Sequence, residues 1–366
     1  MDYKSLFKEK LSKLLFLEIN QEGFKKSVNI PEYISFKNKE LFLPISSEYI
    51  TSNIQDKIKI ENLPIYYFIE GMLLTLGADK NISFSDDYKL LLMQIPESEE
   101  CAKSLVAKRV KEERLEDAYL ILKGLLEVFE NEEYMKKLLL IGISIREKDS
   151  GFEEILLEDI DQAKILFNKM KEPYLYKGII LKDKTDYAGA KVEINEYLRR
   201  GGEQTPEIEM LMNDIENVTT YEKAVSLVDE EPEKSIGLFL SLLDKFQENP
   251  LIYYYLGLCY RKVGQFEKAI YYLLESLRIE SGILEVVNEL GLNYACIGNY
   301  EEAIKYFKKA FEASREVEIC TNIIMCYINL GNLEDAKLHL KIAKQLNKDD
   351  EIVQKIEKLI SKKENK

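Results

Sequence analysis

The C-terminal third of the chain contains three consecutive segments of similar sequence, and this repetition limits the possible folds more than any other feature. Three residue types keep the same register in all three segments, at intervals of 34 and then 33 residues. The recurring residues are Gly264, Gly298 and Gly331; Ala269, Ala303 and Ala336; and Tyr260, Tyr294 and Tyr327. A period of this length is typical of a solenoid, in which each repeat is one supersecondary unit that buries its apolar face against its neighbours.

Each segment has the pattern of two helices joined by a turn. In the first segment, Tyr253, Leu256 and Tyr260 recur at the spacing of one helix face, so we expect them in the core. Gly264 follows this helix, at a point where glycine adopts a left-handed backbone at little cost. Gly257, and Gly291 in the second segment, are expected where the second helix crosses closely, because a side chain there would force the two helices apart. Acidic residues then open the second helix, where they interact favourably with its positive end.

Segments 250–279, 284–313 and 317–346 resemble tetratricopeptide repeats. The first two carry the family's pattern of a large residue, Leu-Gly and Tyr, followed by Ala, an aromatic residue and Ala. The third segment has Ile324 where the family has glycine, and none of the three has the family's closing proline. The resemblance implies an all-α solenoid of helix-turn-helix hairpins that holds other proteins and performs no catalysis.

The same pattern continues upstream in a weaker form. Gly178 and Ala190 lie at nearly the spacing seen in the C-terminal segments, and residues 63–77 resemble the start of the first repeat, with Pro64 and Gly71 seven residues apart. We therefore divide the chain into 1–62, an N-terminal cap or small docking segment; 63–249, degenerate tetratricopeptide-like hairpins; 250–347, three tetratricopeptide repeats; and 348–366, a capping helix and tail.

The two ends of the chain differ from the repeats. At the C-terminus, we expect a capping helix with Asp349 or Asp350 as its N-cap and with Ile352, Ile356 and Leu359 as its apolar stripe. A solenoid requires such a polar-faced lid.

The N-terminal segment begins with an amphipathic pattern over residues 1–20, which predicts a helix. Two short alternating runs within residues 34–46 flank Lys-Asn-Lys and predict a small β-hairpin. Residues 47–57 are predicted to form another helix.

Charge and composition exclude several classes of function. The formal net charge is −14 and the sequence pI is about 5.0, whereas a protein that binds duplex DNA needs a basic face to displace counterions. We therefore expect no nucleic-acid partner and no binding to an anionic membrane surface. The sequence has neither a signal peptide nor an apolar run long enough to span a bilayer, so we expect a cytoplasmic protein. The odd number of cysteines, 5, without C-x-x-C spacing indicates small buried hydrophobes rather than disulfides.

Residues suited to catalysis or metal binding are scarce. The single histidine, His339, lies on a predicted helix surface, and Cys320 and Cys326 are spaced so that they point to different faces of a helix. Phosphate-binding, dinucleotide-binding and hydrolase motifs are absent, and the paired acids are explained by solvated helix faces. We therefore expect no enzyme, no cofactor and no metal.

The first helices of the repeats carry the residues best suited to binding a partner. In the tetratricopeptide family, the face one step from the core stripe lines a concave groove that binds extended or helical peptides. By this correspondence, the predicted partner-binding residues are Tyr254, Leu258, Arg261, Glu285, Asn288, Glu289, Leu292, Glu318, Thr321, Asn322 and Met325. Asparagines there can both donate to and accept from a peptide backbone. The basic clamp with which some members hold a terminal carboxylate is absent, so a peptide of basic and apolar character is the expected ligand.

Three classes of function follow from these observations. The preferred one is a non-catalytic scaffold or adaptor that binds a partner peptide segment in the groove. The alternative is a peptide-responsive regulator, whose N-terminal effector module would form a helical bundle or a helix-turn-helix within residues 1–62. An enzyme with the repeats as a docking arm is disfavoured, since so short an N-terminal segment is too small for most catalytic folds. The sequence leaves the partner and the oligomeric state open.

Overall fold

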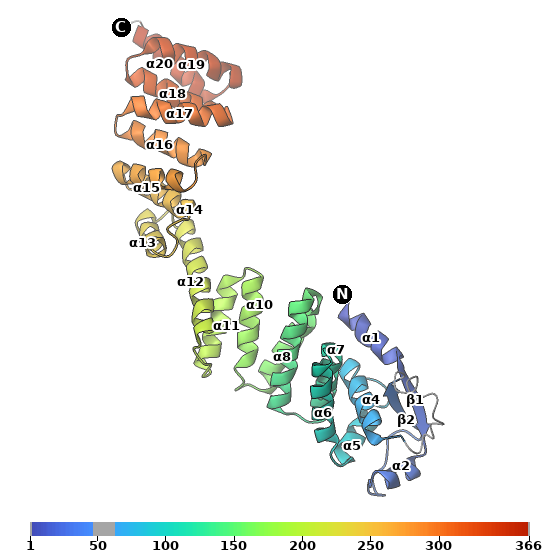
Figure 1. Cartoon of the computed structure of the whole chain (residues 1–366). Coiled ribbons are helices and arrows are strands. Elements are labelled where there is room, and N and C mark those ends of the chain that lie inside the picture. The colour runs from blue at the N-terminus through green and yellow to red at the C-terminus, as the bar shows by residue number, and fades with distance from the viewer. Residues whose placement is uncertain (1, 47–62, 365–366) are drawn as a thin grey trace. The chain divides into compact units, whose positions relative to one another are not determined.

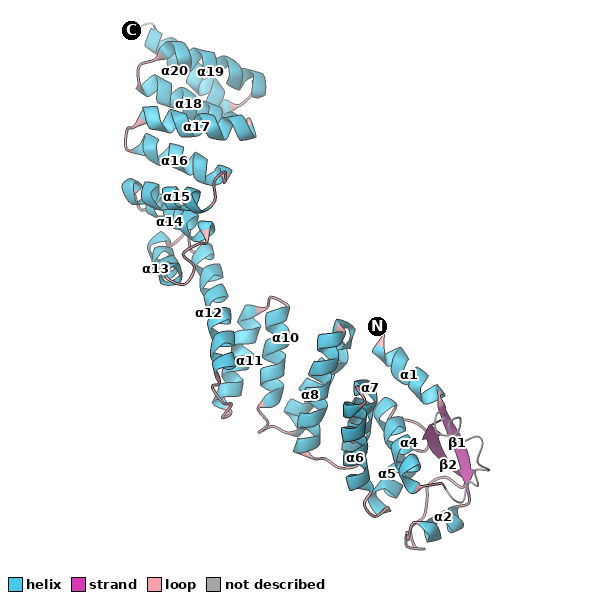
Figure 2. Cartoon of the chain, viewed as in Figure 1, coloured by secondary structure: helices cyan, strands magenta, loops and turns pink. Residues whose placement is uncertain are grey.

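The computed structural model describes residues 2–46 and 63–364, and the chain divides into two compact units, Met1–Glu209 and Met210–Lys366. We call them the N-terminal unit and the C-terminal unit. Both are built mainly from helices, as predicted (Figures 1 and 2). Within the described ranges, no helix combines the length and the apolarity needed to cross a membrane.

The N-terminal unit contains α1 (Tyr3–Ser12), β1 (Leu14–Ile19), α2 (Gln21–Ser27), β2 (Leu41–Ser46), α4 (Ile65–Ala78), α5 (Ser85–Gln94), α6 (Ser98–Lys111), α7 (Leu115–Leu126), α8 (Glu132–Lys148), the short 3-10 helix η2 (Ser150–Phe152), α9 (Glu153–Leu166), α10 (Glu172–Asp183) and α11 (Tyr187–Arg199). The division between the units falls in the first turn of α12 (Pro206–Ser226). The C-terminal unit continues with α13 (Pro232–Leu243), α14 (Pro250–Lys262), α15 (Phe266–Ile279), α16 (Leu284–Cys296), α17 (Tyr300–Ser314), α18 (Val317–Asn329), α19 (Leu333–Leu346) and α20 (Glu351–Glu364).

The small sheet of the N-terminal unit differs from the prediction. The expected hairpin within residues 34–46 is wrong, because β2 pairs antiparallel with β1, in a register that joins Leu14 to Ser46 and Ile19 to Leu41. The predicted N-terminal helix accordingly ends at Ser12 instead of continuing through residue 20. Pairing with a distant strand outweighs the local helical pattern here. The predicted helix at residues 47–57 lies outside the described residues.

A buried carboxylate explains why the Lys-Asn-Lys segment is not a hairpin turn. Asp87, on α5, accepts hydrogen bonds from the backbone N–H groups of Lys37 and Asn38 at 2.7 and 3.2 Å. It also accepts one from the Asn38 side-chain amide at 2.7 Å. These backbone groups therefore pair with a helix side chain instead of with a strand.

Close helix crossings organise the core of the N-terminal unit. A Cβ added to Gly77 on α4 would lie 1.9 Å from the Leu120 carbonyl oxygen on α7, and one added to Gly124 would lie 2.0 Å from that of Leu73. The backbones of α4 and α7 thus touch at two glycines. Gly71, which the sequence likens to Gly257, lies instead against the β2 backbone, 2.0 Å from the Pro44 oxygen by the same measure. Its likeness to the C-terminal repeats is therefore one of sequence and not of packing.

The three predicted hairpins of the C-terminal unit are present as α14–α15, α16–α17 and α18–α19. Gly257 and Gly291 lie at helix crossings as expected, since a Cβ would come within 2.5 Å of Leu273 and 2.6 Å of Phe307. The turn glycines have the predicted left-handed backbone, with φ of +75°, +79° and +75° at Gly264, Gly298 and Gly331.

An aromatic contact also repeats along the C-terminal unit. The tyrosine near the end of each first helix packs on a ring of the second helix, with centroids 5.2 to 5.4 Å apart. The pairs are Tyr260–Tyr272, Tyr294–Tyr306 and Tyr327–His339. His339 therefore takes the place of a tyrosine in the third hairpin, and it is half-buried on the helix surface.

The hairpin α10–α11 shares one element of this geometry. A Cβ at Gly178 would lie 2.6 Å from Ile194, which follows it at the same interval that separates Gly257 from Leu273. Ala190 is completely buried, like Ala269. The upstream sequence similarity at Gly178 and Ala190 thus corresponds to a similar helix crossing.

The capping helix α20 forms as predicted, but its buried stripe is shifted. Asp350 is the N-cap and accepts hydrogen bonds from the N–H groups of Ile352 and Val353 at 2.8 and 3.0 Å. The buried residues are Val353, Ile356 and Ile360, whereas the predicted Ile352 is 50% exposed and Leu359 is only half-buried. Ile356 is therefore buried as predicted, whereas the outer two positions of the stripe are each one residue further along, at Val353 and Ile360.

The cysteines are less uniform than the sequence suggested. Cys259, Cys320 and Cys326 are buried, Cys101 is half-buried, and Cys296 is exposed. The prediction of a buried thiol is therefore wrong for Cys296, which lies in the last turn of α16.

The left-handed turn glycines provide a test of the repeat geometry. Gly298→Ala is expected to lower the free energy of unfolding by about 1–2 kcal/mol, because φ is +79° and no neighbouring atom lies within 4 Å, so only backbone strain changes. Gly298→Asn should cost less, since asparagine tolerates this conformation. Hydrogen exchange of α16 and α17 measures the loss of stability in each variant. Equal losses for the two variants would contradict the left-handed backbone at Gly298.

Candidate partner-binding face

The first helices of the three hairpins, α14, α16 and α18, contact one another in sequence along the C-terminal unit, with α15 and α17 packed between consecutive members. They carry all of the predicted partner-binding residues, which we call the first-helix face. The positions recur because each hairpin repeats the same helix crossing. A ligand that follows this face would contact three repeats in turn.

Exposure divides the predicted residues into three groups. Glu285, Glu318 and Met325 are exposed. The half-buried residues are Tyr254, Leu258, Arg261, Asn288, Leu292 and Asn322. Glu289 and Thr321 are buried, with 8% and 4% of their surface exposed. These last two residues have almost no surface to offer a partner.

Both buried residues have partners within the protein. Arg261 Nε donates to Glu289 Oε2 at 2.6 Å, and its Nη2 lies 3.3 Å from Oε1, so a two-point ion pair joins the first and second repeats. The Thr321 hydroxyl donates to the Glu318 carbonyl oxygen at 2.7 Å. Arg261 is therefore neutralised, and a two-point arginine–carboxylate pair of this kind is geometrically specific.

Asparagines on α16 retain unused hydrogen-bonding groups. The Asn288 Oδ1 is buried and has no hydrogen-bond donor among the described residues. A buried acceptor without a donor costs about 1–3 kcal/mol, so an incoming N–H group would gain stability there. Asn293, one turn further along α16, donates to the Glu289 carbonyl oxygen at 2.8 Å, and its Oδ1 also lacks a donor. Asn293 is completely buried on the core side of the helix, so it does not belong to the first-helix face.

Tyr254 supplies an aromatic surface beside acidic groups. Burial, followed by the carboxylates of Glu289 and Glu285, raises the pKa of Tyr254 to about 12. Its phenol therefore stays protonated and neutral near pH 7 and can donate a hydrogen bond. The Tyr255 ring lies 5.3 Å away. Aromatic groups with a polar end of this kind are common anchors at interfaces.

These features define a helical-repeat protein with a continuous polar and apolar face on its first helices. Two models of the tetratricopeptide repeat match the chain, at residues 250–282 and 284–316. The chain therefore contains tetratricopeptide repeats, as the sequence predicted, and repeats of this family serve in protein–protein interaction.

Several solved structures match parts of this chain. The crystal structure of MamA is 18% identical, with coverage of 48% of this chain and 90% of that chain and a TM-score of 0.36. YrrB, described as a TPR protein with an unusual peptide-binding site, is 18% identical, with coverage of 65% and 97% and a TM-score of 0.29. PilW, described as a type IV pilus biogenesis factor, is 19% identical, with coverage of 62% and 97% and a TM-score of 0.36. TM-scores this low support no inference about function. No curated protein matches the chain.

Proposed function

We propose that the chain is a non-catalytic scaffold or adaptor that binds a partner peptide segment along the first-helix face of α14, α16 and α18. The observation that carries this proposal is the Oδ1 atom of Asn288, which is buried without a donor among the described residues. Glu285 and Glu289 lie on the same helix. A peptide backbone N–H supplies the missing donor. Leu258, Leu292 and Met325 offer apolar contacts alongside.

The charge of this face favours a basic and apolar partner. Since Glu289 neutralises Arg261, Glu285 and Glu318 are the charged groups of the predicted set that remain exposed and have no ion-pair partner among the described residues. Lysine or arginine in the partner would complement them, whereas a carboxylate would be repelled. The net charge of −14 supports the further proposals of no nucleic-acid partner and no binding to an anionic membrane surface. A cytoplasmic location is proposed as well.

The regulator alternative gains no support from the N-terminal residues that are described. Residues 2–46 contain two helices and the β1 strand paired with β2, which differs from the helical bundle or helix-turn-helix that this alternative requires. The scaffold therefore stays the preferred proposal.

Affinity purification from the native host, with mass spectrometry of the bound proteins, tests the proposed face. The variant Tyr254→Ala/Asn288→Ala is expected to lose the specific partner, because it removes the aromatic anchor and the free acceptor together. Tyr271→Ala is the matched control, since Tyr271 is 59% exposed on α15, a second helix, and should retain the partner.

The affinity for a peptide from the captured partner then measures how much binding the variant loses. We expect the double variant to weaken binding of that peptide at least about ten-fold, and about a hundred-fold if both residues are anchors. If the double variant binds the partner with the affinity of the wild type, the first-helix face is not the binding site.

A further inference from the structure

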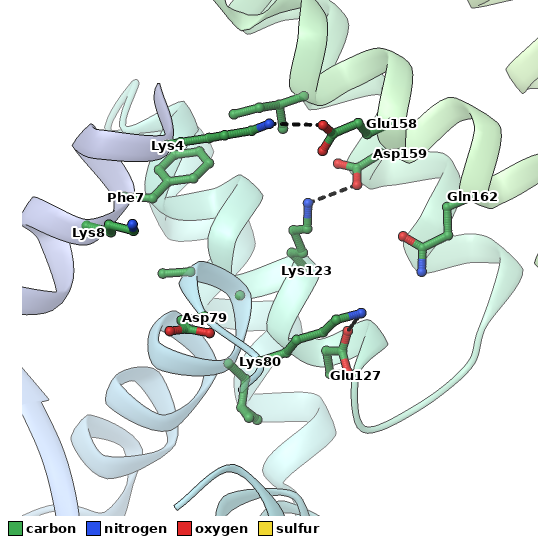
Figure 3. Close-up of a pocket in the computed structure, with 14 residues that line it drawn as sticks. Lys4, Phe7, Lys8, Asp79, Lys80, Lys123, Glu127, Glu158, Asp159 and Gln162 are labelled. Atoms are coloured by element: carbon green, nitrogen blue, oxygen red, sulfur yellow. Dashed lines mark hydrogen bonds and ion pairs between the residues drawn. The ribbon is translucent and has the colours of Figure 1, made fainter. Parts of the chain in front are cut away.

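The N-terminal unit contains a polar cavity that the proposed scaffold role does not use. It lies among α1, α4, α7 and α9 and has a volume of about 570 Å³, within the size range of small-molecule sites. Lysines and carboxylates from all sides reach into it, among them Lys8, Lys80, Lys123, Glu158 and Asp159 (Figure 3).

The glycine contact between α4 and α7 builds this cavity. Because the two backbones touch at Gly77 and Gly124, the end of α4 lies directly against the turn of α7 that carries Lys123. Lys80 follows the end of α4 and lines the same space. A side chain at either glycine would displace the wall that holds both lysines.

The deepest polar contact of the cavity is an ion pair with an unused acceptor. Lys123 Nζ lies 2.9 Å from Asp159 Oδ1, and the two side chains are 30% and 3% exposed. The other oxygen of Asp159 is buried and has no hydrogen-bond donor among the described residues. Burial raises the pKa of Asp159 to about 7, against the attraction of Lys80, and lowers the pKa of Lys123 to about 8, against the attraction of Glu158. Groups perturbed in this way within a cavity are candidates for a functional site.

The cavity is lined by four lysines and four carboxylates, Lys4, Lys8, Lys80 and Lys123 and Asp79, Glu127, Glu158 and Asp159, so its formal charges balance. Two of the lysines nevertheless lack a close ion pair. Lys8 has no ion-pair partner among the described residues. Lys80 lies 3.7 Å from Glu127, whose other oxygen is only 2.7 Å from Lys89. By contrast, Glu158 is paired with Lys4 at 3.0 Å. An incoming anion would therefore meet Lys8 and Lys80 without displacing a close ion pair, and it could accept a further hydrogen bond from Lys123 while that ammonium stays paired with Asp159.

We propose that this cavity binds a small carboxylate that also carries a hydroxyl or amino group. Its carboxylate oxygens accept hydrogen bonds from Lys123, Lys80 and Lys8, and its O–H or N–H group donates to the free oxygen of Asp159. A ligand without that donor leaves the oxygen unsatisfied and binds more weakly. The polar lining is unsuited to a lipid or to another purely apolar ligand.

Three four-carbon dicarboxylates test this proposal on the full chain. Succinate, L-malate and L-aspartate share one skeleton, but succinate lacks the hydroxyl or amino donor. By isothermal titration calorimetry, we expect malate or aspartate to bind at least about ten-fold more tightly than succinate. Only malate and aspartate can donate a hydrogen bond to the free carboxylate oxygen of Asp159. Equal affinities for all three, or dissociation constants weaker than about 10 mM for all three, would overturn the proposal.

Variants that keep the buried pair intact locate the site. Lys8→Met/Lys80→Met is expected to weaken binding of each probe about three- to ten-fold. Lys137→Met is the matched control, since Lys137 is exposed on α8 and does not line the cavity. Hydrogen exchange with the probe bound should show protection in α7 and α9; protection confined to other elements, or an unaffected double variant, would contradict the assignment.

Discussion

Replacing Gly77 with alanine is expected to destabilise the N-terminal unit by about 3 kcal/mol. The added Cβ would lie 1.9 Å from the Leu120 carbonyl oxygen and 3.0 Å from the Gly124 nitrogen. Both are backbone atoms of α7, so no side chain can rotate away to relieve the contact. The helices α4 and α7 must separate instead, and this opens the core around Leu73 and Leu120, which are completely buried.

Gly237 provides the matched control for this substitution. It lies within α13, and a Cβ there would meet no heavy atom within 4 Å, so Gly237→Ala should stabilise its helix by about 0.5–1 kcal/mol. Denaturant unfolding followed by circular dichroism gives the total change, and hydrogen exchange of α4 and α7 assigns it to the N-terminal unit. Unchanged protection of α4 and α7 in Gly77→Ala would show that the two helices do not touch there.

The contrast among glycines shows what the sequence could predict. Gly264, Gly298 and Gly331 were assigned to left-handed turns because a repeat shows the same residue three times in one local setting. Gly77 and Gly124 have no such series. Their contact joins residues far apart in the chain, and nothing in the sequence near either glycine indicates the other.

The same distinction explains the N-terminal sheet. The alternating pattern correctly marked the residues of β2 as extended. Its pairing with β1 depends on α4, which packs on β2, and on Asp87, which holds the backbone of Lys37 and Asn38. Local propensity contains no information about these partners.

For the first-helix face, periodicity places the residues on the correct helices but does not resolve their exposure. Glu289 is one residue from Asn288, yet the ion pair with Arg261 holds it against the protein. Thr321 occupies the position of Tyr254 in the third repeat, and its smaller side chain is buried where the tyrosine is half-buried. The cavity of the N-terminal unit was not predictable at all, because Lys123 and Asp159 belong to no motif and meet only through the tertiary fold.

Breaking the ion pair between Lys123 and Asp159 is also expected to destabilise the N-terminal unit. Lys123→Met is expected to lower the free energy of unfolding by about 1–2 kcal/mol at pH 8, because Asp159, which is 3% exposed, loses its ammonium partner and must either stay charged without it or take up a proton. The double variant Lys123→Met/Asp159→Leu should unfold at nearly the free energy of the wild type, because replacing both buried charges by apolar groups removes the desolvation cost as well as the attraction.

The loss in Lys123→Met should depend on pH in a defined direction. Burial raises the pKa of Asp159 from 3.8 to about 7 in the wild type, and loss of the ammonium group raises it further. A carboxyl group whose pKa is raised in the folded state binds more protons there than in the unfolded chain, so stability falls as pH rises between the two pKa values. The deficit of the variant relative to the wild type should therefore be small at about pH 5 and grow above about pH 7. Denaturant unfolding with hydrogen exchange of α7 and α9 at both pH values measures this; a deficit of equal size at pH 5 and pH 8 would mean that the charge of Asp159 does not cause it.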